Sequence, residues 1–231
     1  MNCAIVIPVY KDQLTANEIR SFKQCLRVLG HYPVILAAPE HLNPNAYHQF
    51  AGKQLPVVRF ADSSFVSVRA YSRLLVSSSF YRRFIDYHYI LLYQLDAWVF
   101  RDELRYWTNK GYDYIGAPWI IPPPLPSKRS LFNISDRLTG KVGNGGFSLR
   151  KIRPHLRWSP VMQLFFRLLP KNEDMLWTLF APFRKPTARE ALQFAFELEP
   201  AQSFLLNNHQ LPFGCHGWEK YQPEFWEQHI P

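Results

Sequence analysis

The chain has 231 residues and a formal net charge of +9, with 47% hydrophobic and 19% charged residues. A hydrophobic share of this size supports one large core and excludes a disordered chain. The positive charge favours an anionic partner, namely a nucleotide, a phosphorylated substrate, nucleic acid or an acidic membrane surface, although solubility alone would also explain it. The basic residues are dispersed in short pairs such as Arg82-Arg83, which argues against nucleic acid.

Cysteine usage and the N-terminal segment both bear on the cellular compartment. Cys3, Cys25 and Cys215 are widely separated and odd in number, which argues against a disulfide framework and fits a reducing compartment. The segment "MNCAIVIPVY" lacks the basic start of a signal peptide, and no apolar run approaches the ~20 residues of a membrane span. We therefore expect a soluble cytoplasmic protein, with peripheral contact to the inner face of a membrane left open.

The first half of the chain alternates strand and helix patterns. Short apolar runs predict strands at residues 3–9, 32–39, 56–60, 89–93 and 112–118. Apolar residues at helical spacing predict helices at residues 17–29, 66–87 and 101–110, and Gly30 stands where a helix C-cap is expected. This order favours an α/β fold with a mostly parallel central sheet flanked by helices.

The second half contains a proline-rich segment and further helices. Residues 120–130 carry four prolines and predict either a linker or an ordered lid. Helices are predicted at residues 159–170 and 187–199, with the acidic segment "NEDMLW" between them. The chain has no internal repeats, and nothing in it indicates a second domain.

Asp96 is a single carboxylate within the apolar segment "YILLYQLDAWVF". It follows a predicted strand, and ligands of open α/β sheets bind beyond the carboxyl ends of the strands. A carboxylate there suits a hard divalent cation with phosphate oxygens, although a cap or an arginine pair would also explain it.

Two further segments contain candidate site residues. The segment "VGNGGFSLR" places Gly143, Gly145 and Gly146 around Asn144, which would let a ligand approach the backbone or would form a tight turn. Asn172, Glu173 and Asp174 begin a predicted helix, where they either stabilise its N-terminus or supply a general base.

His216 lies between Cys215 and Gly217 near the C-terminus. A lone histidine is more often structural than a ligand, but an imidazole suits Mn²⁺ better than Mg²⁺ or Ca²⁺. Zinc is disfavoured because no second Cys or His stands at a suitable spacing.

In their order along the chain, these motifs resemble those of the GT-A class of nucleotide-sugar glycosyltransferases. More closely, the chain resembles a bacterial glycosyltransferase-like family that has long been catalogued as a domain of unknown function. The shared segments are "YQLDA.VF", "GYDYIGAPW", "VGNGGFSLR", "ED" and "PFGCH.W", and the resemblance extends over residues 4–226. It implies one GT-A-like, Rossmann-like domain over residues 1–231. Residues 1–118 would form its nucleotide-donor-binding half and residues 119–231 its acceptor-binding half.

The resemblance also implies which residues bind the donor. The end of the first strand would line the nucleoside pocket, and the glycine-rich segment would lie under the donor sugar and the acceptor. Independently of the resemblance, the negative charge of such a donor favours basic side chains as phosphate partners. The donor-binding residues are thus expected to be Pro8, Val9, Tyr10, Arg73, Gln94, Asp96, Asn144, Gly145 and Gly146, with Lys11 and Arg69 as further phosphate partners.

The same resemblance implies the metal ligands and the base. Asp96 matches the last acid of an Asp-x-Asp motif that binds Mn²⁺ or Mg²⁺, and His216 matches a late metal-ligand histidine. Asp174, or its neighbour Glu173, matches the acid that deprotonates the acceptor hydroxyl in inverting members. Gln94 stands where the class has the first Asp of the motif, and an amide supplies no charge, so metal dependence is in question.

We therefore expect an inverting, divalent-metal-assisted glycosyltransferase of the hexosyltransferase type. Its donor would be a nucleotide sugar, most simply a UDP-sugar, and its acceptor a hydroxyl of a cell-surface glycan precursor, free or lipid-linked, in polysaccharide biosynthesis. Gln94 encourages one alternative, a non-catalytic nucleotide-sugar-binding module. The net charge and the 16% aromatic content suggest a remoter one, a nucleic-acid-binding protein.

Overall fold

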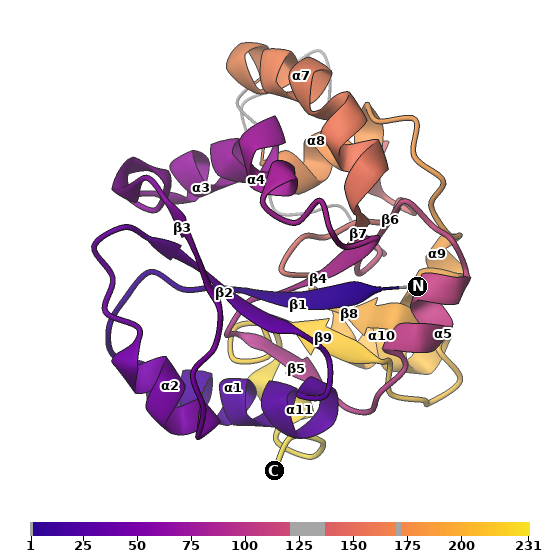
Figure 1. The fold of residues 1–231 in the computed structure, drawn as a ribbon. Coiled ribbons are helices and arrows are strands. Elements are labelled where there is room, and N and C mark those ends of the chain that lie inside the picture. The colour runs from indigo at the N-terminus through magenta and orange to yellow at the C-terminus, as the bar shows by residue number, and fades with distance from the viewer. Residues whose placement is uncertain (1, 121–136, 170–171) are drawn as a thin grey trace.

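A six-stranded sheet forms the centre of the molecule (Figure 1). The computed structural model describes residues 2–120, 137–169 and 172–231. The strand order is β3-β2-β1-β4-β7-β6. The bounds are Cys3–Pro8 for β1, Val34–Pro39 for β2, Val57–Phe60 for β3, Tyr89–Tyr93 for β4, Tyr114–Ile115 for β6 and Phe147–Lys151 for β7.

The sheet is mostly parallel, as the sequence predicts. Strands β1 to β4 run parallel to one another, and β7 alone runs antiparallel to its neighbours β4 and β6. Every residue of β1, β2 and β4 is buried, which explains why these strands appear as continuous apolar runs rather than alternating ones. The α/β fold class is therefore confirmed.

Alternate residues of the strands serve two separate cores. Ile5 and Ile7 of β1 pack with the helices of one face, and Ala4 and Val6 pack with the helices of the other. The first core contains residues of α1 (Ala16–Leu29), α2 (Asn45–Ala51), α5 (Leu104–Asn109) and α9 (Ala188–Phe194). The second contains residues of α3 (Val68–Leu75), α4 (Ser78–Arg82), α7 (Ile152–Leu168) and α8 (Glu173–Leu179), which lie together on one side of the sheet in Figure 1.

Three predicted helices have different bounds in the structure. The helix expected at 66–87 is two helices, α3 and α4, because the Ser77 side chain caps a new helix by accepting from the Phe80 backbone N–H. Helix α7 begins at Ile152, seven residues before its expected start, and contains Pro160. The helix expected at 187–199 ends at Phe194 and is followed by a strand.

A second, three-stranded sheet was not predicted, and it positions part of the site. Its order is β5-β9-β8, from Ala97–Val99, Gly214–His216 and Ala195–Phe196. Helices α10 (Pro200–Leu206) and α11 (Pro223–Trp226) accompany it and were not predicted either. Strands this short carry little periodicity for sequence reasoning to detect.

Several other expectations concern the whole chain. The three cysteines are buried and unpaired. Across residues 2–120, 137–169 and 172–231, no helix combines the length and apolarity needed to cross a membrane. The proline-rich segment 120–130 lies outside the described residues, apart from Ile120.

Candidate functional site

Asp96, Gln94 and His216 meet at the carboxyl end of β4. The antiparallel pairing of β5 with β9 sets Ala97 opposite His216, which brings the end of the chain to the residues that follow β4. His216 Nε2 lies 3.0 Å from Oε1 of Gln94 and 3.1 Å from Oδ1 of Asp96. The two residues that sequence reasoning assigned to a metal are thus neighbours.

A second carboxylate stands on the opposite side of the His216 ring. Oε1 of Glu197, a residue only 6% exposed, lies 3.0 Å from Nδ1. Burial favours the neutral imidazole, but the charges of Glu197 and Asp96 outweigh it and hold the pKa of His216 well above its usual range. Burial likewise works against an ionised Asp96, yet the attraction of His216 lowers the pKa of that carboxyl. In the absence of a metal ion, this cluster is a protonated imidazole between two carboxylates.

The donor atoms of this cluster fit a divalent cation. Within the described ranges, no three His, Cys, Asp or Glu side chains form a metal-binding group. The amide oxygen of Gln94 nevertheless gives a third donor beside Asp96 Oδ1 and His216 Nε2. One imidazole and two oxygens suit Mn²⁺, and a carboxylate on the far ring nitrogen is the usual support of a histidine ligand. His216 would bind as the neutral imidazole and would release its proton on binding.

Two adjacent glycines, Gly145 and Gly146, lie between this cluster and a second acidic cluster that contains Glu173 and Asp174. A Cβ atom on Gly146 would lie 2.0 Å from His216 Nε2, and a Cβ atom on Gly145 would lie 3.0 Å from Glu173 Oε1 and 3.3 Å from Asp174 Cβ. Only glycine therefore fits at position 146, and the need there is for space, since the positive φ of this segment belongs to Gly143. Gly146 thus lies against the first cluster and Gly145 against the second, so two consecutive residues connect the acidic clusters.

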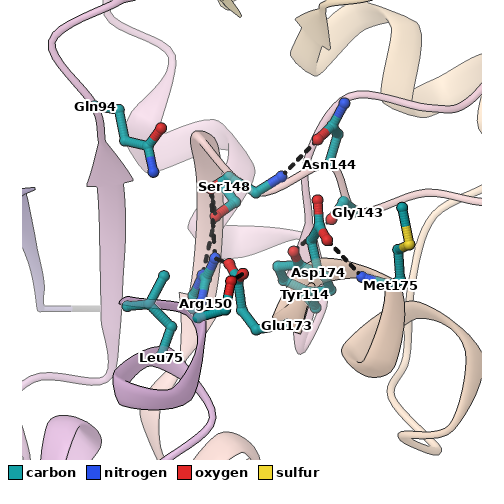
Figure 2. A network of polar contacts seen from close by, with 12 residues as sticks. Leu75, Gln94, Tyr114, Gly143, Asn144, Ser148, Arg150, Glu173, Asp174 and Met175 are labelled. Carbon is teal, nitrogen blue, oxygen red and sulfur yellow. Dashed lines mark hydrogen bonds and ion pairs between the residues drawn. The ribbon is translucent and has the colours of Figure 1, made fainter. Parts of the chain in front are cut away.

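Glu173 in the second cluster belongs to a buried ion-pair network (Figure 2). Arg150 of β7, fully buried, places Nη2 3.2 Å from Glu173 Oε1, and Ser72 of α3 donates to Glu173 Oε2 at 3.1 Å. Arg150 also donates to the Tyr81 hydroxyl at 3.2 Å and to Ser148 Oγ at 3.0 Å. Both carboxylate oxygens of Glu173 thus have partners, so this side chain fixes the start of α8 in place.

Asp174 faces away from that network. In Figure 2 its carboxylate points toward the Asn144 segment while Glu173 turns to Arg150. Its Oδ1 accepts the Met175 backbone N–H at 2.7 Å, and the residue is half-buried. Burial, followed by the charge of Glu173, raises the pKa of Asp174 to about 8. Of the two candidate bases, Asp174 is the one whose second carboxylate oxygen has no hydrogen-bond partner among the described residues, and its pKa lies close to neutrality.

A cavity of about 650 Å³ opens beside Asp96 and Gln94. Its lining includes four aromatic and five charged side chains. The aromatic group is Tyr10, Tyr47, Phe65 and Tyr71. Lys220 belongs to the charged group, and the tight turn that follows His216, at Gly217 with φ +64°, brings it there. Rings beside charges of both signs suit a ligand with a flat ring at one end and a metal-bound anion at the other.

The predicted donor residues are distributed over several environments. Pro8, Tyr10, Gln94 and Asp96 line the cavity, as does Lys11, which pairs with Glu18 at 2.9 Å. Other predicted donor residues do not line the cavity. They lie in a buried strand end, on an exposed helix surface or in the glycine-rich segment. These are Val9, buried after β1; Arg73 and Arg69, exposed on α3; and Asn144, buried, whose Oδ1 accepts the Gly145 N–H. The lining also includes Gly217, Glu219 and Lys220, so both expected halves of the chain contribute to it.

Sequence reasoning missed four residues that shape the site. Glu197 was assigned to a helix, and Tyr71 to the apolar face of another. Arg150 was part of a quoted motif without a role, and Lys220 was not singled out. A basic residue inside an otherwise buried strand was the one available signal, since Arg150 needs an acidic partner.

The α/β architecture, with its central sheet flanked by helices, is similar to the GT-A fold of solved glycosyltransferase structures. The chain belongs to the family described as "Protein of unknown function (DUF5672)", whose family model matches residues 54–216. No curated protein sequence matches the chain.

Several solved structures with a similar fold are glycosyltransferases. Mouse xyloside xylosyltransferase 1 has a TM-score of 0.59 and 11% identity, over 94% of this chain and 98% of that one. Galactosyltransferase LgtC, in complex with donor and acceptor sugar analogs, has a TM-score of 0.57 and 13% identity, over 92% and 86%. Core-mannan synthase A of Aspergillus fumigatus, in its Mn/GDP form, has a TM-score of 0.54 and 11% identity, over 78% and 69%.

Proposed function

We propose that this protein is a glycosyltransferase that transfers a sugar from a nucleotide sugar, most simply a UDP-sugar, to a hydroxyl of a cell-surface glycan precursor with inversion. One observation carries the proposal. The peptide of Gly145 and Gly146 sets a candidate cation cluster, Asp96 and His216, directly beside a carboxylate with a raised pKa, Asp174. Leaving-group stabilisation and proton removal are the two tasks that such a transfer requires.

The cavity beside Asp96 is suited to the nucleotide of the donor. Its volume of about 650 Å³ falls within the usual range for small-molecule sites. Exposed Tyr10 and buried Tyr47 present rings that can pack against a base, and Lys220 offers a cation for the diphosphate. The residues of the cavity thus support recognition of a ligand that combines a base with phosphates.

Asp96, Gln94 and His216 are the residues that would hold Mn²⁺ or Mg²⁺. The cation would neutralise the diphosphate as negative charge develops on it. Glu197 keeps the His216 ring oriented from its far nitrogen. Because Gln94 contributes an amide in place of a second carboxylate, the site carries less negative charge, and we expect weaker binding of the metal in the absence of nucleotide.

Asp174 is the proposed general base. The acceptor hydroxyl must lose a proton as its oxygen attacks the sugar, and the carboxylate of Asp174 receives that proton. Arg150 and Ser72 hold Glu173 in the neighbouring ion pair, so Glu173 orients the start of α8 and is not itself the proton acceptor. The raised pKa of Asp174 makes it a stronger base than an ordinary aspartate.

Calorimetry with UDP and GDP in the presence of Mn²⁺, followed by hydrolysis assays on a panel of sugar nucleotides, tests this function. Asp96→Asn should weaken metal-dependent nucleotide binding by about 100-fold, because it removes the only carboxylate among the three proposed ligands. Asp86→Asn, an exposed acid distant from the site, is the matched control and should leave binding unchanged.

A flat response across all donors, together with no binding of UDP or GDP, would contradict the proposal. Tight nucleotide binding without hydrolysis of any donor, or transfer to any acceptor, would instead identify a non-catalytic nucleotide-sugar-binding module. Gln94 is the observation that favours this second function.

A further inference from the structure

The outer side of helix α7 exposes apolar side chains to solvent. Val161, Leu164 and Leu168 are 38%, 53% and 69% exposed, although the opposite side of the helix, with Met162 and Phe166, is buried in the core. Scattered exposed apolar residues are ordinary, but these three follow one another at three- and four-residue spacing along one helix. They form a continuous stripe.

Arginines share this side of α7. Arg153, Arg157 and Arg167 are all exposed, and their spacing puts them among the apolar residues of the stripe. The helix contains no acidic residue. We call these six residues the α7 face: Arg153, Arg157, Val161, Leu164, Arg167 and Leu168.

The charge pattern continues onto the two helices that lie beside α7. Helix α4 packs against α7, and α3 precedes α4, all on one side of the sheet (Figure 1). Exposed arginines follow on both, at Arg69, Arg73 and Arg82. Together α3, α4 and α7 contain six arginines and no acidic residue. Ion pairs such as Arg101–Glu103 and Arg150–Glu173 form elsewhere.

We propose that the α7 face docks on a lipid surface that carries anionic headgroups. Helices that lie at such surfaces combine an apolar stripe, which enters the headgroup boundary, with arginines or lysines that contact the phosphates. Nucleic acid would require the arginines but not the leucines. A second copy of the chain would bring two arginine-rich faces together, and their like charges repel.

The inference goes beyond the proposed sugar transfer and stands independently of it. It nevertheless predicts how the site would be oriented relative to the lipid surface. Helix α8 begins with Glu173 and Asp174, and it packs against α7. Docking by this face would bring the side of the molecule that contains Asp174 toward the lipid surface. An acceptor attached to a lipid would then be presented on that side.

Co-sedimentation of the full chain with phosphatidylcholine vesicles, with and without phosphatidylglycerol, tests the docking. We expect binding to the anionic vesicles only. Arg157→Glu/Arg167→Glu should weaken it by about 25-fold or more, since each arginine contributes roughly fivefold to partition onto an anionic surface. The matched control Arg105→Glu/Arg189→Glu changes the net charge equally on α5 and α9 and should stay within about twofold of wild type.

The apolar part of the face has its own pair of variants. Leu164→Glu/Leu168→Glu should weaken vesicle binding by about tenfold or more, because the leucines no longer enter the headgroup boundary. Leu205→Glu/Leu206→Glu, an exposed apolar pair on α10, should bind as wild type. Circular dichroism and thermal unfolding of each variant verify its fold without reference to nucleotide binding, so the failure of this test is distinct from a failure of the proposed sugar transfer.

Three results would overturn the docking. One is equal binding to both vesicle types, or none to either. Another is an equal loss of binding in the α7 variants and their controls. The third is a different partner for the face: RNA or DNA binding that depends on Arg157 and Arg167, or dimers that Leu164→Glu/Leu168→Glu dissociates, with no binding to vesicles.

Discussion

The two acidic clusters of the site have similar components but different cations. In one cluster Glu173 pairs with Arg150, and the two side chains are 9% and 0% exposed. In the other Asp96 pairs with His216, and the side chains are 46% and 15% exposed. An arginine keeps its charge at every accessible pH, whereas an imidazole can release its proton. The first pair is therefore permanent, and the second can exchange a proton for a metal cation.

This difference determines what each carboxylate can do. Glu173 is held by a fixed charge and by Ser72, and the negative charge it retains contributes to the raised pKa of Asp174. Asp96 lies beside His216, whose positive charge is lost when the imidazole releases its proton. The lowered pKa of Asp96 keeps this carboxylate ionised, as a metal ligand must be. The neighbouring cation therefore distinguishes the structural role of Glu173 from the proposed ligand role of Asp96, and from the proposed base role of Asp174.

The largest expected effect concerns Asp174, which forms no ion pair with any of the described residues. Asp174→Asn should lower turnover by roughly 10²–10⁴-fold, because an amide cannot accept the proton of the acceptor hydroxyl. Nucleotide affinity should stay within about twofold, since Asp174 does not line the donor cavity. Steady-state kinetics and UDP calorimetry measure the two quantities. Normal turnover in this variant would assign the base elsewhere.

The permanent pair should be important for stability rather than for chemistry. Arg150→Met leaves Glu173 buried and unpaired, so we expect the free energy of unfolding to fall by roughly 3–5 kcal/mol. Combining it with Glu173→Gln removes the orphaned charge and should restore part of the loss. Urea denaturation of the single and double variants measures both. A single variant as stable as wild type would show that Arg150 does not carry the ion pair's contribution.

The sequence alone predicts the frame of this site well. Buried parallel strands appear as apolar runs without polar interruption, so β1, β2 and β4 could be located, and Asp96 with them. His216 and Asp174 are candidates from the residues alone, and the class resemblance predicts their roles as metal ligand and base. What could not be predicted are contacts between distant segments. The β5–β9 pairing that sets His216 beside Asp96 depends on two three-residue strands more than 110 positions apart.

Glu197 and Gly146 illustrate why such contacts escape sequence reasoning. Glu197 follows an apolar helical pattern that predicts a continued helix, yet it contacts His216 from the position directly after β8. Gly146 appears as a turn glycine by composition, but its function is to leave space for the His216 ring. In both residues the determining partner is a side chain that lies elsewhere in the chain.

The exchangeable cluster can be weakened without touching a proposed ligand. Glu197→Gln should lower Mn²⁺ affinity by about 10- to 100-fold, because the His216 ring loses the carboxylate that orients it. Glu199→Gln, two residues further on, is the control and should bind Mn²⁺ normally. Mn²⁺ titration in the presence of UDP measures the affinities. Equal affinity in wild type and Glu197→Gln would remove Glu197 from the support of the cation.

The smallest effect is a displacement of the pH profile, and it addresses the coupling between Glu173 and Asp174. The base must be deprotonated, so kcat/KM should decline below the pKa of about 8 of Asp174 in the free enzyme. In Glu173→Gln the neighbouring negative charge is gone, so this decline should move to lower pH by on the order of one unit. The double variant Arg150→Met/Glu173→Gln should shift less in the same direction, since Glu173 affects the pKa of Asp174 more than Arg150 does.

The titration of Asp174 should also make the free energy of unfolding depend on pH. Native Asp174 keeps its proton up to about pH 8, whereas an unfolded aspartate loses it near pH ~3.9. The native state therefore binds more protons in this interval, and its contribution to the free energy of unfolding decreases as pH rises from about 4 to about 8. In Glu173→Gln the upper limit of this pH range should move to lower pH. In Asp174→Asn the pH-dependent contribution should be absent. Urea denaturation across this range measures the slope, and an unchanged slope in Asp174→Asn would show that another group titrates.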